Sequence, residues 1–507
     1  MRNMNVVFSE SKGTINPNIY GHFAEHIGGV IYDGLWVGED SDIPNIRGFR
    51  KALIDSIKKL HPPVLRWPGG CFAESYDWRD GIGPRVERPT RVNWWYSFDK
   101  RTESNHVGTH EFIDLCQMIG AEPYFAANMT STTPLHIRDW VEYCNFPSGT
   151  ALSDERGNNG HKEPFAIPYW GIGNENWGGG GQMTPEQCAR EYIRYSTIIN
   201  SLDKDNLKFI MCGPNGHDVD WTSRLMREWA TLKWHEAPTY GMSVHYYCGN
   251  AGDPIAFTEA EWYRQLHQAN YMQKVLDDHR AAMMPHDPDM QIGIVVDEWG
   301  CWHKDGSGPS KGKKLFEQQS SIRDAVVAAM TLNIFNERCD SVVMANVAQL
   351  VNNLHSLYLA SGDQFIETPN YFVFDMYQGH MGAKQLRIVS ESPMLICDGF
   401  VPMPSISASA SVAKDGSVLV TLANLNYDKD DEFALCGVDG SLSGHAQIQL
   451  LQGETPQSHN DFECPERIKP ICSEQDFKDG DRITIPAASI MSIRIKLDCD
   501  PKEQKPE

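Results

Sequence analysis

YWGIGNENW, residues 169–177, is a short apolar run that ends on a carboxylate between two carboxamides, with an indole after them. Four glycines, residues 178–181, follow directly. A run this short, closed by a glycine-rich turn, is typical of a buried strand with polar groups at its C-terminal tip. A glutamate on a rigid element beside hydrogen-bonding groups suits chemistry better than core packing. We therefore predict that Glu175 is a general acid/base and that the chain places it near one partner, Glu298.

Length and composition describe an ordinary globular protein with excess negative charge. The chain has 507 residues, too many for one compact core, so two domains are expected. It is 41% hydrophobic and 22% charged, with a formal net charge of −22. Nucleic acids and anionic membranes require clustered Lys and Arg, so neither is expected as a partner, whereas a neutral substrate suits this charge. No apolar run of about 18 residues is present, so no membrane span is expected.

The N-terminus and the cysteines point to a cytoplasmic protein. Residues 1–11 hold one Arg and no apolar core, so no signal peptide is expected. The 13 cysteines are an odd number and form no CxxC pair. Scattered cysteines of this kind fit reduced thiols better than a disulfide framework.

Strand-like and helix-like segments alternate along the first 380 residues. Eight such units predict a parallel sheet closed into a (β/α)₈ TIM barrel over residues 18–383. An open doubly wound sheet is the alternative, but no GxGxxG turn follows the first strand. The predicted strands are 19–27, 64–67, 123–128, a fourth that begins at Tyr169 and ends on Glu175, 207–212, 242–247, 292–299 and 341–349. The predicted helices are 48–60, 109–119, 134–144, 185–202, 221–234, 259–283, 315–335 and 371–379.

Helical periodicity disappears after about residue 384. Alternating segments at 405–412 and 417–422 are joined by Lys-Asp-Gly, which indicates a hairpin, and 448–451 and 483–497 are further strands. Residues 384–497 are therefore expected to form an all-β domain, a jelly-roll-like sandwich. The charged, proline-containing tail 498–507 is predicted to be disordered.

In a (β/α)₈ barrel the active site lies at the C-terminal ends of the strands. The polar residues expected there are hydrogen-bonding groups with some aromatic rings, which suits a polyhydroxylated ligand. They are Glu25, His26, Arg66, Cys71, Asn128, Asn174, Glu175, His245, Tyr247, Asp297, Glu298, Trp302, Asn346 and Gln349.

The segment VVDEWG, residues 295–300, has the same pattern as the opening stretch: an apolar run, expected to be a buried strand, ends on a carboxylate at the rim. Two carboxylates in unequal environments are what glycoside hydrolysis requires. Strand side chains alternate, so only one of Asp297 and Glu298 is expected to face the mouth, and the apolar pattern leaves open which. A single rim glutamate could equally be a helix cap or half of an ion pair. Two rim carboxylates, one beside Asn174, favour chemistry.

No metal or cofactor is expected, because no HExxH, CxxC or 2-His-1-carboxylate spacing occurs. His22 and His26, at i and i+4, would share one side of a strand, but His26 fits a supporting residue of the site better than a metal ligand. Trp94-Trp95-Tyr96 is either a sugar platform or a packed loop, and the sequence leaves both open.

Six stretches in order along the chain resemble family 51 glycoside hydrolases, the α-L-arabinofuranosidases. They are YGHFAEHIGGVIYDGLW, RWPGGCFAESYDWRDGIGP, GIGNENWG, VHYY, VVDEWG and ANVAQLVN. The resemblance implies a retaining hydrolase with its acid/base on strand 4 and its nucleophile on strand 7, which selects Glu298 over Asp297. It also implies that residues 1–17 join the β-domain and that the chain forms a cytosolic homo-oligomer, commonly a hexamer.

The resemblance also assigns roles by position. Glu175 would be the acid/base and Glu298 the nucleophile. The family's pattern departs at Cys71, where many members carry an Asn that contacts the sugar, and Cys is a poorer hydrogen-bond partner. The remaining roles would be sugar-hydroxyl contacts for Asn174, Glu25 and Gln349, orientation of the nucleophile for Tyr247, support for His245 and Arg66, and apolar walls for Trp302 and Trp95.

The expected function is therefore exo-hydrolysis of arabinofuranosyl groups from arabinan, arabinoxylan or derived oligosaccharides. An endo-β-glucanase or xylosidase on the same barrel is the second possibility, and a carbohydrate-binding protein with a dead site is the third. For a retaining enzyme, we expect the two carboxyl groups about 5–5.5 Å apart.

Overall fold

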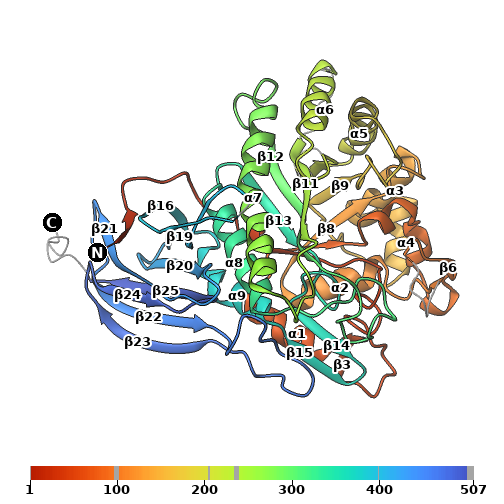
Figure 1. The fold of residues 1–507 in the computed structure, drawn as a ribbon. Coiled ribbons are helices and arrows are strands. Elements are labelled where there is room, and N and C mark those ends of the chain that lie inside the picture. The colour runs from red at the N-terminus through yellow and green to blue at the C-terminus, as the bar shows by residue number, and fades with distance from the viewer. Residues whose placement is uncertain (1, 96–101, 204–205, 233–238, 398, 499–507) are drawn as a thin grey trace, which may run out of the picture.

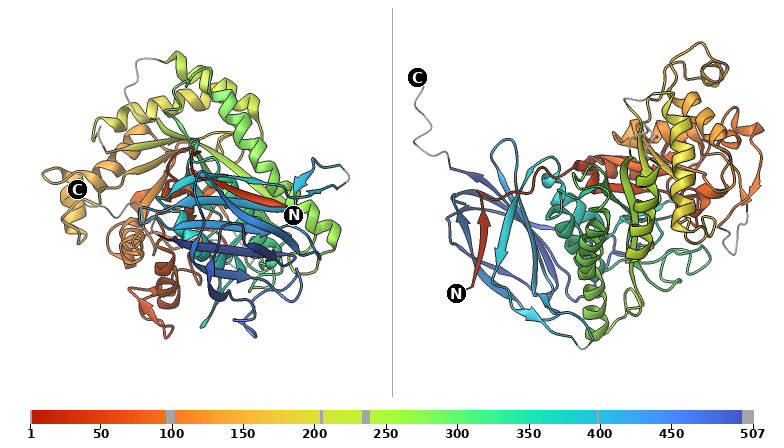
Figure 2. Two further views of the ribbon diagram at one scale, coloured as in Figure 1. Left: turned by 90° about the vertical axis from the view of Figure 1, so that its left-hand side faces the viewer. Right: turned by 90° about the horizontal axis from the view of Figure 1, so that it is seen from above.

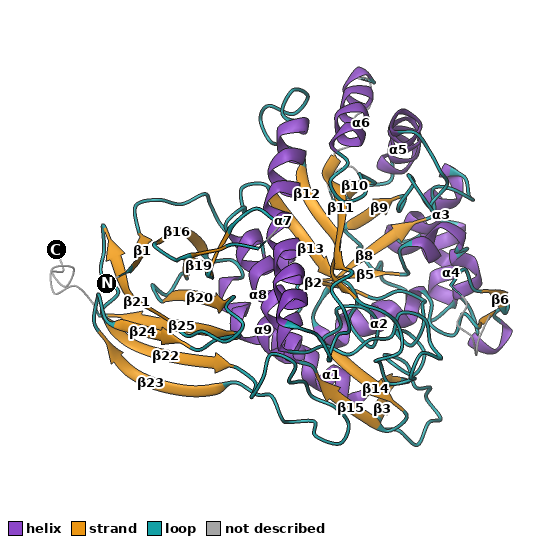
Figure 3. Cartoon of the chain, viewed as in Figure 1, coloured by secondary structure: helices purple, strands orange, loops and turns teal. Residues whose placement is uncertain are grey.

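In the computed structural model, which describes residues 2–95, 102–203, 206–232, 239–397 and 399–498, the opening stretch forms β9 (Tyr169–Ile172). β9 is one of eight parallel strands in a closed barrel of order β10-β11-β12-β13-β2-β5-β8-β9 (Figure 3). The closed barrel confirms the predicted (β/α)₈ fold and excludes the open sheet. The other strands are β2 (Gly21–Phe23), β5 (Val64–Trp67), β8 (Glu122–Ala127), β10 (Lys208–Met211), β11 (Thr239–Gly249), β12 (Gly293–Trp302) and β13 (Val342–Val347).

Helices surround the barrel, and their starts are encoded locally. Thr133 and Thr184 each accept a backbone N–H of the first turn, and a proline follows each of them at the first helical position. The helices are α1 (Lys51–Ile57), α2 (Thr109–Ile119), α3 (Pro134–Asn145), α4 (Ala151–Asn158), α5 (Pro185–Asn200), α6 (Val219–Thr231), α7 (Glu259–Met283), α8 (Ile322–Asn336) and α9 (Pro369–Tyr377).

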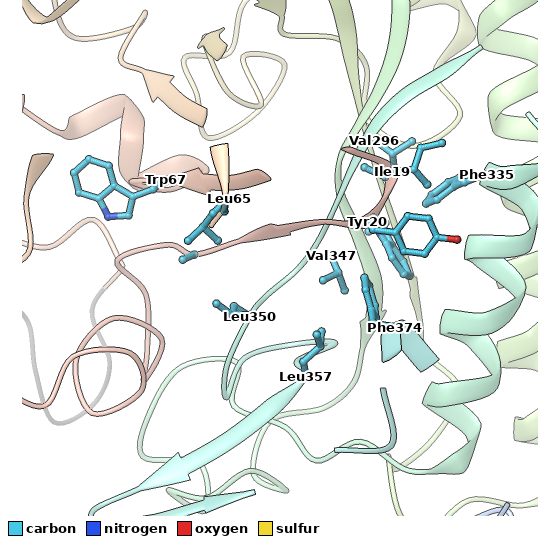
Figure 4. Packing of buried hydrophobic residues seen from close by; sticks show 14 of the residues in the cluster. Ile19, Tyr20, Leu65, Trp67, Val296, Phe335, Val347, Leu350, Leu357 and Phe374 are labelled. Carbon is cyan, nitrogen blue, oxygen red and sulfur yellow. The ribbon is translucent and has the colours of Figure 1, made fainter. Parts of the chain in front are cut away.

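The main core lies between the strands and these helices (Figure 4). Tyr20, Phe335 and Phe374 pack there, with the rings of Tyr20 and Phe374 edge to face at 6.3 Å. Trp67 stacks on Phe112 at 5.0 Å between ring centroids. Close packing of such large buried rings holds the strands and helices that carry them in fixed relative positions.

A nine-stranded sheet forms the second body and corresponds to the predicted C-terminal β-domain (Figure 1). Its order is β23-β22-β25-β20-β19-β16-β1-β21-β24, so β1 from the N-terminus lies between β16 and β21 (Figure 2). Its strands are β1 (Asn3–Val7), β16 (Lys384–Ser390), β19 (Ile406–Val412), β20 (Val418–Asn424), β21 (Asp431–Val438), β22 (Gly444–Leu451), β23 (Ile471–Phe477), β24 (Arg482–Ile485) and β25 (Ser489–Leu497).

The loops in the described part of the chain contain four two-stranded sheets: β3 (Asn45–Ile46) with β4 (Phe49–Arg50), β6 (Arg91–Val92) with β7 (Thr102–Glu103), β14 (Tyr358–Ser361) with β15 (Gln364–Glu367), and β17 (Met394–Leu395) with β18 (Met403–Pro404). None of the described helices has the length and apolar character of a membrane span. Of the predicted tail, residues 499–507 lie outside the described part of the chain.

α8 joins the two bodies. Every residue of α8 is buried, because the barrel covers one side and the β-domain the other. Asn333 and Asn336 on α8 donate to the hydroxyls of Ser407 and Ser409 on β19, each at 3.1 Å. A helix buried on both sides couples the position of the β-domain to that of the barrel.

Several predicted boundaries were wrong. The strand predicted over 19–27 is a 3₁₀ turn (Pro17–Tyr20) followed by the three residues of β2, because Asn16 caps a turn that Pro17 opens. The helix predicted over 315–335 begins only at Ile322, and 315–321 is loop. The strand predicted over 483–497 is broken between β24 and β25 at Pro486, which has no N–H to donate. α4 was not predicted.

Candidate active site

Glu175 stands just beyond β9 on a left-handed turn. Gly173 has φ +85° and Glu175 itself φ +45°. A Cβ on Gly173 would lie 2.2 Å from Oδ1 of Asn176, so only glycine fits there. A glutamate at positive φ is uncommon and persists only where its surroundings hold it.

Glu74 holds that turn, and no role was predicted for it. Its Oε1 accepts from the backbone N–H of Asn174 at 2.6 Å and from Nδ2 of Asn176 at 3.1 Å. Its Oε2 accepts from the backbone of Met129 and Thr130 at 2.9 and 2.8 Å. Burial raises the pKa of Glu74 to about 7, although these donors oppose the rise. The sequence held one signal for a role of Glu74: it lies three residues after Cys71, within the stretch RWPGGCFAESYDWRDGIGP that carries the family resemblance.

Glu298, on β12, is surrounded by groups that favour its ionised form. Arg66 Nη1 donates to Oε1 at 2.9 Å, and the Tyr247 hydroxyl donates to Oε2 at 2.7 Å. Burial by itself would raise the pKa of Glu298, but the charges of His245 and Arg66 and these hydrogen bonds outweigh it, so the pKa is lowered.

Asp297 also reaches Arg66, with Nε 3.8 Å from its Oδ2. Its carboxylate accepts from the Tyr124 hydroxyl at 2.9 Å and from Asn346 at 3.2 Å, inside the barrel. The register of β12 shifts against β13 at this point, which lets consecutive carboxylates approach the same guanidinium. Of the two, only Glu298 lines the pocket at the mouth.

His245 lies between the two glutamates. Its Nδ1 is 3.0 Å from Oε1 of Glu175 and 3.6 Å from Oε2 of Glu298. One atom from each of these three side chains lies within 4.8 Å of the others, so a carboxylate oxygen of Glu175 is that near to one of Glu298. Burial would lower the pKa of His245, but the charge of Glu298 and the contact with Glu175 outweigh it, and the pKa is raised. These three groups could also hold a cation.

Glu25 forms the opposite wall. Its Oε1 accepts from the backbone N–H groups of Gly70 and Phe72 and, at 2.7 Å, from Nε1 of Trp95. Gln349 donates to Oε2 at 3.1 Å. Burial, with the charge of Glu298 adding to it, raises the pKa of Glu25 to about 7.

Cys71 touches both residues at the tip of β9. Its thiol donates to Oε2 of Glu175 at 3.4 Å, and Nδ2 of Asn174 donates to the sulfur at 3.8 Å. Burial raises the pKa of the thiol, so it remains protonated. Arg66 Nη2 fixes the other end of the Asn174 amide at 2.7 Å.

A small pocket of about 50 Å³ opens between these groups. Trp302, 37% exposed, meets Tyr247 edge to face at 5.1 Å and Phe316 at 4.8 Å. Three apolar lining residues, Ile27, Phe316 and Leu354, were not predicted, and Phe316 was hidden inside the mispredicted helix. The pocket is lined by Glu25, Ile27, Cys71, Trp95, Glu175, Tyr247, Glu298, Trp302, Phe316, Gln349 and Leu354. Arg66, Asn174 and His245 lie behind this lining and contact the two glutamates or each other.

Three residues expected at the rim serve other contacts. Asn128 donates to the Tyr76 carbonyl and to Ser131. Asn346 is bound to Asp297, as described above. His26 has Nδ1 on Glu103 at 2.9 Å and Nε2 on Trp67 at 3.1 Å, so it is a supporting group.

His22 and His26 share no site, because both ring nitrogens of His26 are used and His22 packs on Phe374. Trp95 forms part of the pocket wall, whereas Trp94 is exposed. Tyr96, the third residue of that predicted platform, lies outside the described residues.

Known proteins share this architecture and sequence. Residues 56–252 match the α-L-arabinofuranosidase 1 domain, and residues 297–489 match the α-L-arabinofuranosidase C-terminal domain. An intracellular exo-α-L-arabinofuranosidase from Bacteroides ovatus is 37% identical over 96% of this chain and 94% of its own length.

Solved structures agree with these matches. The GH51 arabinofuranosidase from Xanthomonas axonopodis pv. citri is 34% identical with a TM-score of 0.91, covering 98% of this chain and 99% of its own. The α-L-arabinofuranosidase from Thermotoga maritima, solved with arabinose, is 29% identical with a TM-score of 0.83, covering 98% and 100%. On identity, coverage and fold together, this chain belongs to the family 51 α-L-arabinofuranosidases.

Proposed function

We propose that this protein is an exo-acting, retaining α-L-arabinofuranosidase, with Glu298 as nucleophile and Glu175 as general acid/base. The observation that carries the proposal is the pair of carboxylates at one small pocket, with oxygens within 4.8 Å. Retaining glycosidases hold their carboxyl groups about 5–5.5 Å apart, and inverting ones about 6.5–9.5 Å, to leave room for a water. The short separation supports direct attack on the sugar.

The surroundings of the two glutamates divide their roles. Arg66 and Tyr247 both donate to Glu298, and its lowered pKa keeps it anionic and ready to attack. Among the described residues, no arginine is paired with Glu175. Nδ1 of His245, at 3.0 Å, can donate to the ionised carboxylate or accept from the protonated acid. Glu175 can therefore change its protonation state without losing this contact, as an acid/base must.

The reaction follows from these roles. Glu298 attacks the anomeric carbon while protonated Glu175 gives its proton to the leaving oxygen, so that a glycosyl-enzyme ester forms and the aglycone departs. Glu175, now ionised, takes a proton from water, whose oxygen attacks the anomeric carbon and releases Glu298. Asn174, Glu25 and Gln349 are proposed to bind sugar hydroxyls, with Trp95 and Trp302 as walls.

Pocket size favours exo action over the alternatives. A cavity of this volume holds roughly three to five water molecules, since each needs about 10–15 Å³ of such space. That is room for one sugar ring, whereas an endo-β-glucanase needs a cleft for several. The proposed substrates are arabinofuranosyl side groups of arabinan, arabinoxylan or derived oligosaccharides. The Bacteroides ovatus relative is named an intracellular exo-α-L-arabinofuranosidase, which supports both the exo action and a cytoplasmic location.

A panel of aryl glycosides tests the reaction. Hydrolysis of the α-L-arabinofuranoside should exceed that of the xyloside and glucoside by at least 100-fold, and NMR should detect the α-anomer of arabinose first. Preferred hydrolysis of the xyloside or glucoside would overturn the substrate assignment, and first release of the β-anomer would overturn the retaining mechanism. Inactivity on the whole panel and on xylan, glucan and arabinan would favour the binding-protein alternative.

We also propose that the protein forms a homo-oligomer, a hexamer as the family resemblance implies. Light scattering after size exclusion would measure the number of chains in the assembly.

A further inference from the structure

A second cluster of chemically active side chains lies behind the pocket wall. Among the described residues, two groups place three potential metal ligands within 4.8 Å of one another: the catalytic Glu175–His245–Glu298 group, and Cys301 with Asp324 and His355. All three members of the second group are buried, at 0% exposed. They come from the end of β12, the first turn of α8 and the loop after β13, so the fold assembles them from three separate segments.

His355 is the least satisfied member. Neither Nδ1 nor Nε2 of its ring has a hydrogen-bond partner among the described residues, although the side chain is completely buried. A neutral imidazole carries one N–H donor and one acceptor, and burial without partners costs free energy. Its position is held from elsewhere, because its backbone N–H donates to Ala348 at 2.8 Å and its Cβ lies against Gly300.

The other two ligands are held by partners of the kind found around metal ligands. Gln265 Nε2 donates to the sulfur of Cys301 at 3.2 Å, whereas burial, with the charge of Asp324 adding to it, raises the pKa of the thiol as long as no cation is bound. Oδ1 of Asp324 is 2.7 Å from Nε2 of His303, which is itself completely buried, and Oδ2 accepts from the backbone and hydroxyl of Ser321. Such partners orient ligands and tune their basicity.

We propose that Cys301, Asp324 and His355 bind a structural zinc ion. Zinc binds thiolate, imidazole and carboxylate ligands, and these three residues would leave the fourth position of its usual tetrahedral shell to a water. One thiolate and one carboxylate also neutralise the two positive charges of the ion, as burial requires. With bonds of about 2.0–2.3 Å, shifts of about 1 Å would bring all three atoms onto one ion. Binding releases the Cys301 thiol proton to solvent, and His303 stays on Asp324 as its orienting partner.

The ion would stiffen the wall of the active-site pocket. Cys301 precedes Trp302, and His355 follows Leu354, both of which line the pocket. Asp324 lies in the first turn of α8, the helix that the barrel shares with the β-domain. Zinc at this position would tie the pocket wall to that helix and would take no part in the chemistry, so the proposal does not depend on the proposed function.

Metal content after reloading tests the site. Tag-free protein is treated with chelator, given one equivalent of Zn²⁺, desalted and measured by inductively coupled plasma mass spectrometry. Wild type should retain about one zinc per chain, with a higher Tm than the chelated protein, whereas Cys301→Ser and His355→Phe should bind at least tenfold more weakly. Two controls should retain zinc: Cys144→Ser, at a buried thiol on α3, and Glu175→Gln, in the other three-ligand group.

Two further measurements leave the three proposed ligands unmutated, so they test the zinc site even if a ligand variant fails to fold. Co²⁺-loaded wild type should show thiolate-to-cobalt charge-transfer absorption, and Cys71→Ser should keep it. Crystals of zinc-loaded protein should give an anomalous peak among Cys301, Asp324 and His355. No zinc uptake by wild type, an anomalous peak at Glu175 and Glu298 instead, or undiminished binding in Cys301→Ser would overturn the proposal.

Discussion

Glu175 and Glu298 have unequal surroundings, and their variants should therefore behave differently. Glu175→Ala removes the proposed proton donor, so hydrolysis of poor leaving groups should fall by about 10²–10⁴-fold, while an aryl substrate with a good leaving group should still form the glycosyl-enzyme. Azide should then restore turnover by attacking that intermediate. Glu298→Ala should be inactive on both substrates, because it removes the proposed nucleophile. Steady-state rates on the two substrates, with and without azide, check this, and azide rescue of Glu298→Ala in place of Glu175→Ala would exchange the roles.

Tyr247 contributes, after His245 and Arg66, to the lowered pKa of Glu298, the proposed nucleophile. Its hydroxyl is one of the groups that lower the pKa of Glu298, so Tyr247→Phe should raise that pKa. The acid limb of kcat/KM should move to higher pH by roughly one unit, and the plateau should fall about 10–100-fold, the value of a hydrogen bond to a charged group. Tyr246→Phe is the matched control, because the Tyr246 hydroxyl donates to Gln268 away from the site. A pH profile with an unmoved acid limb in Tyr247→Phe would contradict this account of the Glu298 pKa.

At the scale of elements, the turn after β9 decides where Glu175 points. Gly173→Ala places a Cβ 2.2 Å from Asn176 at φ +85°, so the turn must shift and move Glu175. Displacement of a catalytic group by about 1 Å can cost 10²-fold, and we expect kcat to fall by at least that factor. Gly120→Ala is the control: its φ is +79°, but nothing lies within 4 Å of the added Cβ. It should cost about 1–2 kcal/mol of stability and leave kcat intact. Equal kcat in the two variants would show that the turn does not position Glu175.

For the whole molecule, the buried helix α8 predicts that the barrel cannot fold without the β-domain. A chain ending at residue 383 would expose the side of α8 that packs on β19, β20 and β25, and would leave Asn333 and Asn336 without Ser407 and Ser409. We expect it to be insoluble or to lack a cooperative thermal transition. A chain ending at residue 498, without most of the predicted disordered tail, should keep the wild-type Tm. Calorimetry of the full chain should give one transition, and a soluble, active 1–383 fragment would refute this dependence.

The choice of Glu298 over Asp297 rested on the family resemblance. Local patterns in the sequence were enough for the alternation of strands and helices, the closed barrel, the C-terminal β-domain and a carboxylate at the ends of the fourth and seventh strands. Each of these depends on periodicity or on residues adjacent along the chain. The sequence pattern did not predict features that depend on long-range contacts. Glu74 holds a turn 100 residues away, and Phe316 lines the pocket from a segment that was predicted to be helical. The shifted register of β12 brings Asp297 and Glu298 to one guanidinium. The group of Cys301, Asp324 and His355 belongs to the same class, since no spacing along the chain marks it. Barrel closure decides which distant side chains meet, and only the tertiary structure contains that information.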